Sequence, residues 1–152
     1  MTSGDTSWAL LFDTDLFFSV RISESLARAG RDTRTVRRIE AFTAALAQQP
    51  PIALVNLAAR GVDWRTAITA CAHAGVPLIA FGPHVAIETQ TEARQLGATT
   101  VVAYSQLMDD LPALIERTRR RAARRLDSER ADITAESSQA PSMAAQPSER
   151  TE

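Results

Sequence analysis

The stretch Pro51–Trp64, with the sequence PIALVNLAARGVDW, decides how the rest of this chain is interpreted. Its residues Ile52–Val55 form a short continuous apolar run, which is typical of a strand buried on both faces of a sheet. Asn56 follows directly, Gly61 marks a turn, and apolar residues at helical spacing begin at Trp64. Because ligands bind at the carboxyl ends of strands in open α/β sheets, this pattern predicts a site at Asn56.

The same alternation of strand and helix repeats along the chain. Four further segments have the pattern of strands, the second of them weaker and charged: Trp8–Phe12, Asp32–Val36, Leu78–Phe81 and Thr100–Ala103. Amphipathic helices are predicted from Leu16 to Ala29, from Ile39 to Leu46, from Trp64, from Ala86 to Leu96, and from Leu107 onward. The order predicts an α/β, flavodoxin-like three-layer fold, in which a five-stranded parallel sheet carries helices on both faces.

The length of 152 residues suits one domain. Its last predicted helix runs into an Arg-rich segment, ERTRRRAARRL, at residues 116–126. From Ser128 onward the chain has no aromatic residue and is dominated by Ser, Ala, Gln, Glu and Pro, a composition that buries too little apolar surface to order itself. We therefore predict a domain over residues 1–127, with an extended Arg-rich last helix, and a disordered tail over residues 128–152.

Composition excludes several classes of chemistry. All 17 basic residues are Arg, so any mechanism that needs a lysine amine is ruled out. The single Cys71 forms neither an internal disulfide nor a cysteine metal cluster. No apolar run approaches the ~20 residues of a membrane span, and the first residues lack the order of a signal peptide. We expect a cytoplasmic protein that has no membrane association.

Four segments occur in the order and spacing of a known family. They are LLFDTD at residues 10–15, the stretch that begins at Pro51, GVPLIAFG at residues 75–82, and LGATTVVAYS at residues 96–105. Over Ala9–Thr118 the chain resembles the receiver domain of bacterial response regulators. This resemblance implies a CheY-like version of the fold. It also implies a phosphorylation site made of a nucleophilic Asp, two acidic Mg²⁺ ligands, a hydroxyl group and a Lys.

Most of that site is replaced in this sequence. Asp13 lies at the first acidic position, and Thr14 lies at the second, with Asp15 directly after it. Asn56 lies at the position of the nucleophile, Gly82 at that of the hydroxyl group and Tyr104 at that of the Lys. An amide is a poor nucleophile and forms no aspartyl phosphate. The resemblance therefore implies a degenerate, pseudo-receiver member of the family, with no catalytic residue, no metal ion and no cofactor.

The string Asp13-Thr14-Asp15 also resembles the first motif of haloacid-dehalogenase-type phosphatases, in which the first Asp is the nucleophile and the second a general acid. That remote alternative is opposed by Phe17, which replaces the usual Thr or Val, and by the absence of Lys. A plainer interpretation is that Asp15 caps the first helix.

We expect function to reside in surface contacts. In receiver domains the fourth helix, fifth strand and fifth helix form a contact surface, and the resemblance implies a protein partner or a homodimer there. The candidate contact residues belong to this predicted face or to the Arg-rich helix: Glu88, Glu92, Tyr104, Arg117, Arg120, Arg121 and Arg124. Nucleic-acid binding by the Arg-rich helix is an alternative, disfavoured because no aromatic residues are interleaved with the charges. A merely solvated basic surface is the simplest interpretation.

Overall fold

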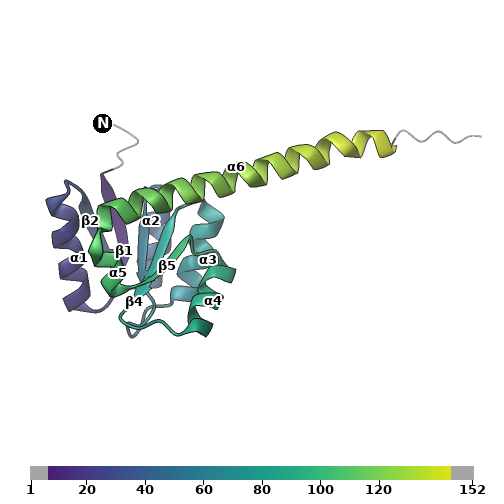
Figure 1. The fold of residues 1–152 in the computed structure, drawn as a ribbon. Helices are drawn as coiled ribbons and strands as arrows, with labels where there is room; N and C mark the ends of the chain where they lie inside the picture. Colours follow the sequence, from purple (N-terminus) through teal and green to yellow (C-terminus); the bar gives the residue numbers. More distant parts are fainter. Residues whose placement is uncertain (1–6, 145–152) are drawn as a thin grey trace, which may run out of the picture. The chain divides into compact units, whose positions relative to one another are not determined.

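The computed structural model describes residues 7–144, with side chains described through residue 134. Its sheet has five parallel strands in the order β2-β1-β3-β4-β5 (Figure 1). The strands are β1 (Trp8–Phe12), β2 (Asp32–Val36), β3 (Ala53–Asn56), β4 (Leu78–Gly82) and β5 (Thr100–Ala103). The helices are α1 (Leu16–Arg28), α2 (Ile39–Leu46), α3 (Trp64–Ala74), α4 (Ile87–Leu96), α5 (Tyr104–Asp109) and α6 (Leu111–Ala144). The predicted flavodoxin-like fold is confirmed.

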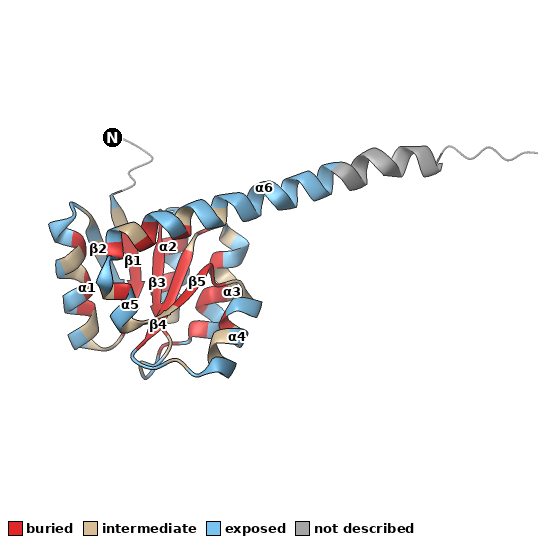
Figure 2. Ribbon diagram, in the orientation of Figure 1, coloured by how far each residue is buried: buried red, intermediate tan, exposed pale blue. Residues whose placement is uncertain are grey.

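Two apolar clusters hold the three layers together. One face of the sheet packs against α2, α3 and α4 through side chains such as Phe42, Ile68 and Ala93. The other face packs against α1, α5 and the start of α6 through side chains such as Ile22 and Leu107. Figure 2 shows that the buried residues concentrate in the strands between these layers. The continuous apolar runs of β1, β3 and β4 follow from this double burial.

Local sequence signals start and end the helices. Asp15 accepts hydrogen bonds from the backbone N–H groups of Phe17 and Phe18, and so caps α1. Asp63 caps α3 by accepting from the N–H of Thr66. These caps confirm the plainer interpretation of Asp15. None of the helices within residues 7–144 is long and apolar enough to cross a membrane.

The last predicted helix needs a correction. It is two helices, because Asp110 adopts a non-helical backbone, with φ −153° and ψ 77°, between α5 and α6. The Asp110 carboxylate then accepts a hydrogen bond from the N–H of Ala113, 3.2 Å away, and satisfies one of the free donors at the start of α6. The apolar spacing from Leu107 to Ile115 crosses this break, since both helices present apolar side chains to the same sheet face.

The predicted tail needs a correction as well. Helix α6 continues to Ala144, so residues 128–144 are helical, and residues 145–152 lie outside the described part of the chain. The compact unit that holds the sheet ends at Ala122, and a second unit begins at Ala123. The prediction weighed only the lack of apolar burial. The Ala, Arg and Glu residues of this segment favour helix intrinsically, without packing.

We predict that Gly97→Ala destabilises the protein more than Gly75→Ala. Both glycines follow a helix with positive φ, 119° and 72°, so either alanine incurs a left-handed cost of about 1–2 kcal/mol. A Cβ at Gly97 would also lie 2.7 Å from the Ala72 Cβ of α3, whereas one at Gly75 meets nothing within 4 Å. The overpacking adds about 1–3 kcal/mol. Urea unfolding monitored by circular dichroism measures both losses, and equal losses would contradict this close approach.

Candidate functional site

The residues carried over from the receiver pattern meet at the carboxyl edge of the sheet. Asp13 follows β1, Asn56 ends β3 and Gly82 ends β4, and these three strands are neighbours. Asn56 Nδ2 donates a hydrogen bond to Asp13 Oδ1, at 3.1 Å. Both side chains are buried, each with about 1% exposure. The structure thus places Asn56 at the edge where the sequence predicted a site.

The Asn56 amide is used at both ends. While its nitrogen donates to Asp13, its Oδ1 accepts a hydrogen bond from the N–H of Ala58, 2.8 Å away in the loop after β3. An ionised carboxylate at this position could accept from Ala58 but could not donate to Asp13. The side chain therefore fixes the loop through one atom and partners a buried carboxylate through the other.

Asp13 has one satisfied and one unsatisfied oxygen. Its Oδ1 accepts from the Asn56 amide and from the N–H of Asp15, 2.8 Å away. Its Oδ2 is buried without a hydrogen-bond partner among the described residues. Burial raises the pKa of Asp13 above its ordinary value, although the bonds from Asp15 and Asn56 oppose that rise. The protonated form of this carboxyl is consequently favoured more in the folded chain than in the unfolded one.

The side chains of the next two residues form hydrogen bonds with backbone groups. The Thr14 hydroxyl donates to the carbonyl oxygen of Arg60 at 2.6 Å, which joins the loop after β1 to the loop after β3. Asp15 is the cap of α1 described above. Thr14, at the position where a receiver has its second acidic ligand, thus joins two loops. No group of three or more His, Cys, Asp or Glu side chains that could hold a metal ion occurs among the residues described.

The two remaining positions are closed by packing. A Cβ on the buried Gly82 would lie 3.3 Å from Val85 Cγ2 and 3.7 Å from Ala58 Cβ, so a side chain there meets its neighbours at once. Tyr104 begins α5, and its ring packs on Phe18 of α1 with the ring centroids 4.4 Å apart. Its hydroxyl is buried and has no hydrogen-bond partner among the described residues.

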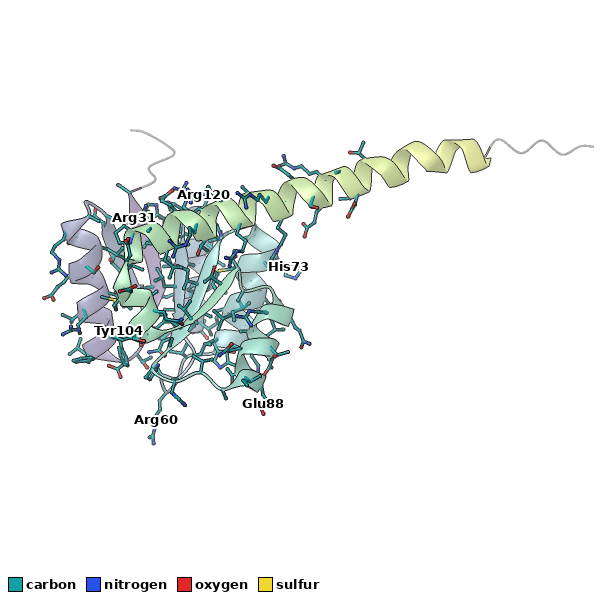
Figure 3. All side chains as sticks on the ribbon, in the orientation of Figure 1. Arg31, Arg60, His73, Glu88, Tyr104 and Arg120 are labelled. Carbon is teal, nitrogen blue, oxygen red and sulfur yellow. The ribbon has the colours of Figure 1, made fainter. Side chains whose placement is uncertain are left out.

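The sequence analysis placed Tyr104 both in the contact surface and at the Lys position of the receiver site. In the structure Tyr104 (labelled in Figure 3) is half-buried and packs on Phe18. Its partner Phe18 was recognised only as part of an apolar stripe. The role of Arg60 was missed, because its backbone carbonyl leaves no signal in the side-chain pattern. The helical spacing of Phe18 was the one available hint of an aromatic contact across the edge.

The predicted contact residues fall into two groups. Glu88, Arg117, Arg120 and Arg124 are exposed, and Figure 3 shows Arg120 on α6 pointing away from the sheet. By contrast, Glu92 forms a two-point ion pair with Arg65 of α3, with Oε2 2.5 Å from Nε and Oε1 3.0 Å from Nη2. Arg121 also has internal partners: its Nη1 donates to the Thr99 carbonyl at 3.2 Å and to the Thr100 hydroxyl at 3.0 Å. Residues of the second group hold the domain's own elements together.

Comparison with known proteins places the fold. No protein-family model matches the sequence, and no curated protein matches it. Solved structures do. A fusion containing the trimeric coiled coil of yeast Spc42 has a TM-score of 0.69 and 16% identity, covering 93% of this chain and 98% of the fusion.

Two receiver domains show the same likeness. The signal receiver domain of a modulated diguanylate cyclase from Desulfovibrio desulfuricans G20 has a TM-score of 0.60 and 20% identity, covering 75% of this chain and 97% of that domain. A CheY-like receiver domain protein from Methanospirillum hungatei JF-1 has a TM-score of 0.63 and 12% identity, covering 76% of this chain and 98% of that protein. The chain therefore has the fold of a response-regulator receiver domain.

The raised pKa of Asp13 predicts a pH effect on stability. A group that binds its proton more tightly when folded makes the free energy of unfolding fall as pH rises from the unfolded value, about 3.8, through the folded pKa. On acidification from pH 7, the native protein should therefore gain stability relative to an Asp13→Asn variant. Urea unfolding at a series of pH values measures the difference, with Asp32→Asn, at an exposed carboxyl, as the control. A difference that does not change with pH would contradict the prediction.

Proposed function

We propose that this protein is a receiver-like signalling or adaptor module that acts through protein contacts and is not switched by phosphorylation of its own site. The observation that carries the proposal is the buried Asn56 amide, bonded to Asp13 on one side and to the Ala58 N–H on the other. The phosphoacceptor of a receiver needs a carboxylate that attacks phosphorus. Here the group at that position is neutral and both of its ends are engaged.

Each further part of a phosphoryl-transfer site is absent or used otherwise. Thr14 joins two loops, Gly82 leaves no hydroxyl, and the sequence has no Lys to hold a phosphoryl oxygen. Asp13 and Asp15 would be the two acids of the phosphatase alternative. Asp15 is the cap of α1, and Asp13 is buried beside Asn56, so neither is presented to a substrate. These contacts favour an adaptor that performs no catalysis.

The surface of α4, β5 and α5 is the proposed contact face. It begins with the exposed Glu88 and with Ile87, whose side chain is 76% exposed. The partner is another signalling protein or a second copy of this chain. Nucleic-acid binding by the exposed Arg117, Arg120 and Arg124 remains the less favoured alternative, since no aromatic residue accompanies them.

Intact mass measurement tests the loss of phosphorylation. Incubation of the protein with acetyl phosphate and Mg²⁺ should leave its mass unchanged, because no carboxylate occupies the nucleophile position. A receiver domain with a complete site, treated in the same buffer, should gain the mass of a phosphoryl group. An acid-labile adduct on the native chain would overturn the proposal.

We also predict that restoring the acid destabilises the fold. Asn56→Asp removes the donor to Asp13 and brings two carboxylates together in a buried place, which should cost about 1–3 kcal/mol at pH 7. The loss should shrink as the pH is lowered and a proton fills the place of the lost donor. Gln95→Glu, the same change at an exposed position of α4, is the matched control. Urea unfolding at pH 7 and at acidic pH measures both variants, and equal losses would contradict the role assigned to Asn56.

A further inference from the structure

The two borders of the sheet differ in character. β2 and β5 are the outermost strands, so each has one side without a neighbouring strand (Figure 1). The β2 border carries the exposed charges of Asp32 and Arg34. The β5 sequence, TVVA, carries none. Charged side chains on an edge strand discourage pairing with another chain. The β5 border lacks that protection, and no further strand among the described residues pairs with its outer side.

A groove runs along the β5 border. It has a volume of about 500 Å³, and it lies between α4 and α5 with part of β5 in its lining. The walls are fixed by their own hydrogen bonds. Gln90 of α4 donates to the Val85 carbonyl at 3.0 Å, and Gln106 of α5 accepts from the N–H of Ala103 at 3.1 Å. Because these side chains are held in place, the groove is formed before any partner arrives.

The groove is basic. Arg94 of α4 lines it and is exposed, and within residues 7–134 it forms no ion pair or side-chain hydrogen bond. His84 lines one end, and no Asp or Glu is part of the lining. The nearest acid along the helix, Glu92, is paired with Arg65 on the side of α3. A carboxylate that entered the groove would therefore meet an unpaired guanidinium, which it can bind through two hydrogen bonds.

We propose that the groove binds an extended, acidic segment of a partner protein, which adds to β5 as a further strand and places a carboxylate on Arg94. The four residues of β5 span about 13 Å at the rise of a strand, and strand addition of this kind gains affinity from the backbone and specificity from the side chains. A second copy of this chain fits less well. Symmetric pairing of two β5 strands would bring a second Arg94 to the interface and no acid from the lining. This inference rests on the proposed adaptor function and names the chemistry of its partner.

Libraries of short peptides test the proposal. The probes are three peptide pools, all with β-branched residues at alternate positions. The other positions hold Asp or Glu in the acidic pool, Lys or Arg in the basic pool, and Ser in the neutral pool. The acidic pool should bind best to the full chain in fluorescence polarisation, and NMR shifts on binding should concentrate at the backbone amides of β5. Equal binding of the three pools, binding without shifts in β5, or no binding at all would overturn the inference. Self-association that shifts the same β5 amides without peptide would overturn it in favour of a second copy.

Substitutions in the two borders sharpen the test. Arg94→Glu should weaken binding of the acidic pool by about tenfold or more, and the variant should then prefer the basic pool. Arg37→Glu changes an exposed arginine beside β2 and should leave the affinity unchanged. Equal affinities of the two variants would contradict the role of Arg94. If the peptides do not bind as expected and the mass measurement shows no phosphoryl adduct, only the proposed role of the groove is refuted. An adduct on the native chain would refute the proposed function itself.

Discussion

The hydrogen bond from Asn56 to Asp13 is the constraint on which the carboxyl edge of the sheet depends. Asp13 is a buried carboxyl with a raised pKa, and the Asn56 amide is the side-chain donor that supports it. An unpaired buried charge is among the most costly features that a fold can contain. The same amide fixes the loop after β3 through Ala58, and Thr14 ties that loop to the one after β1. Receiver domains hold a phosphoryl group at this edge of the sheet. In this chain the side chains there hold two loops together.

Packing also involves the remaining positions at this edge of the sheet. Val85 lies against Gly82 on one side of the edge, and the Tyr104 ring reaches across to Phe18 of α1 on another. The aromatic contact joins the last strand's tip to the first helix, so two elements that are distant in sequence are held together at the edge. The proposed adaptor function assigns contacts to the outer faces, where α4, β5 and α5 present exposed side chains and a basic groove.

Sequence reasoning succeeded where a local pattern has one physical meaning. The short apolar runs of β1, β3 and β4 were correctly predicted as buried strands, and of the interpretations of Asp15 the helix cap is confirmed. It failed where a pattern is compatible with two structures. The apolar spacing from Leu107 continues through the break at Asp110, because two helices on one sheet face share it. The segment after Ser128 lacks apolar residues, which we interpreted as disorder, yet helix formation depends on backbone propensity as well as burial.

By itself the sequence determined the five strands, the first four helices and the flavodoxin-like fold, because residue type and spacing are carried locally by the chain. The comparison of Asp13, Thr14, Asn56, Gly82 and Tyr104 with a phosphorylation site came instead from the resemblance to receiver domains. Only the tertiary structure decided which of the replaced residues act together and which charges are free. In the sequence, Arg121 cannot be told from Arg120, nor Glu92 from Glu88. In the structure Arg121 bonds Thr100 of β5 and Glu92 pairs with Arg65 of α3. Such pairings depend on distances between elements far apart in the chain, and one-dimensional spacing does not encode them.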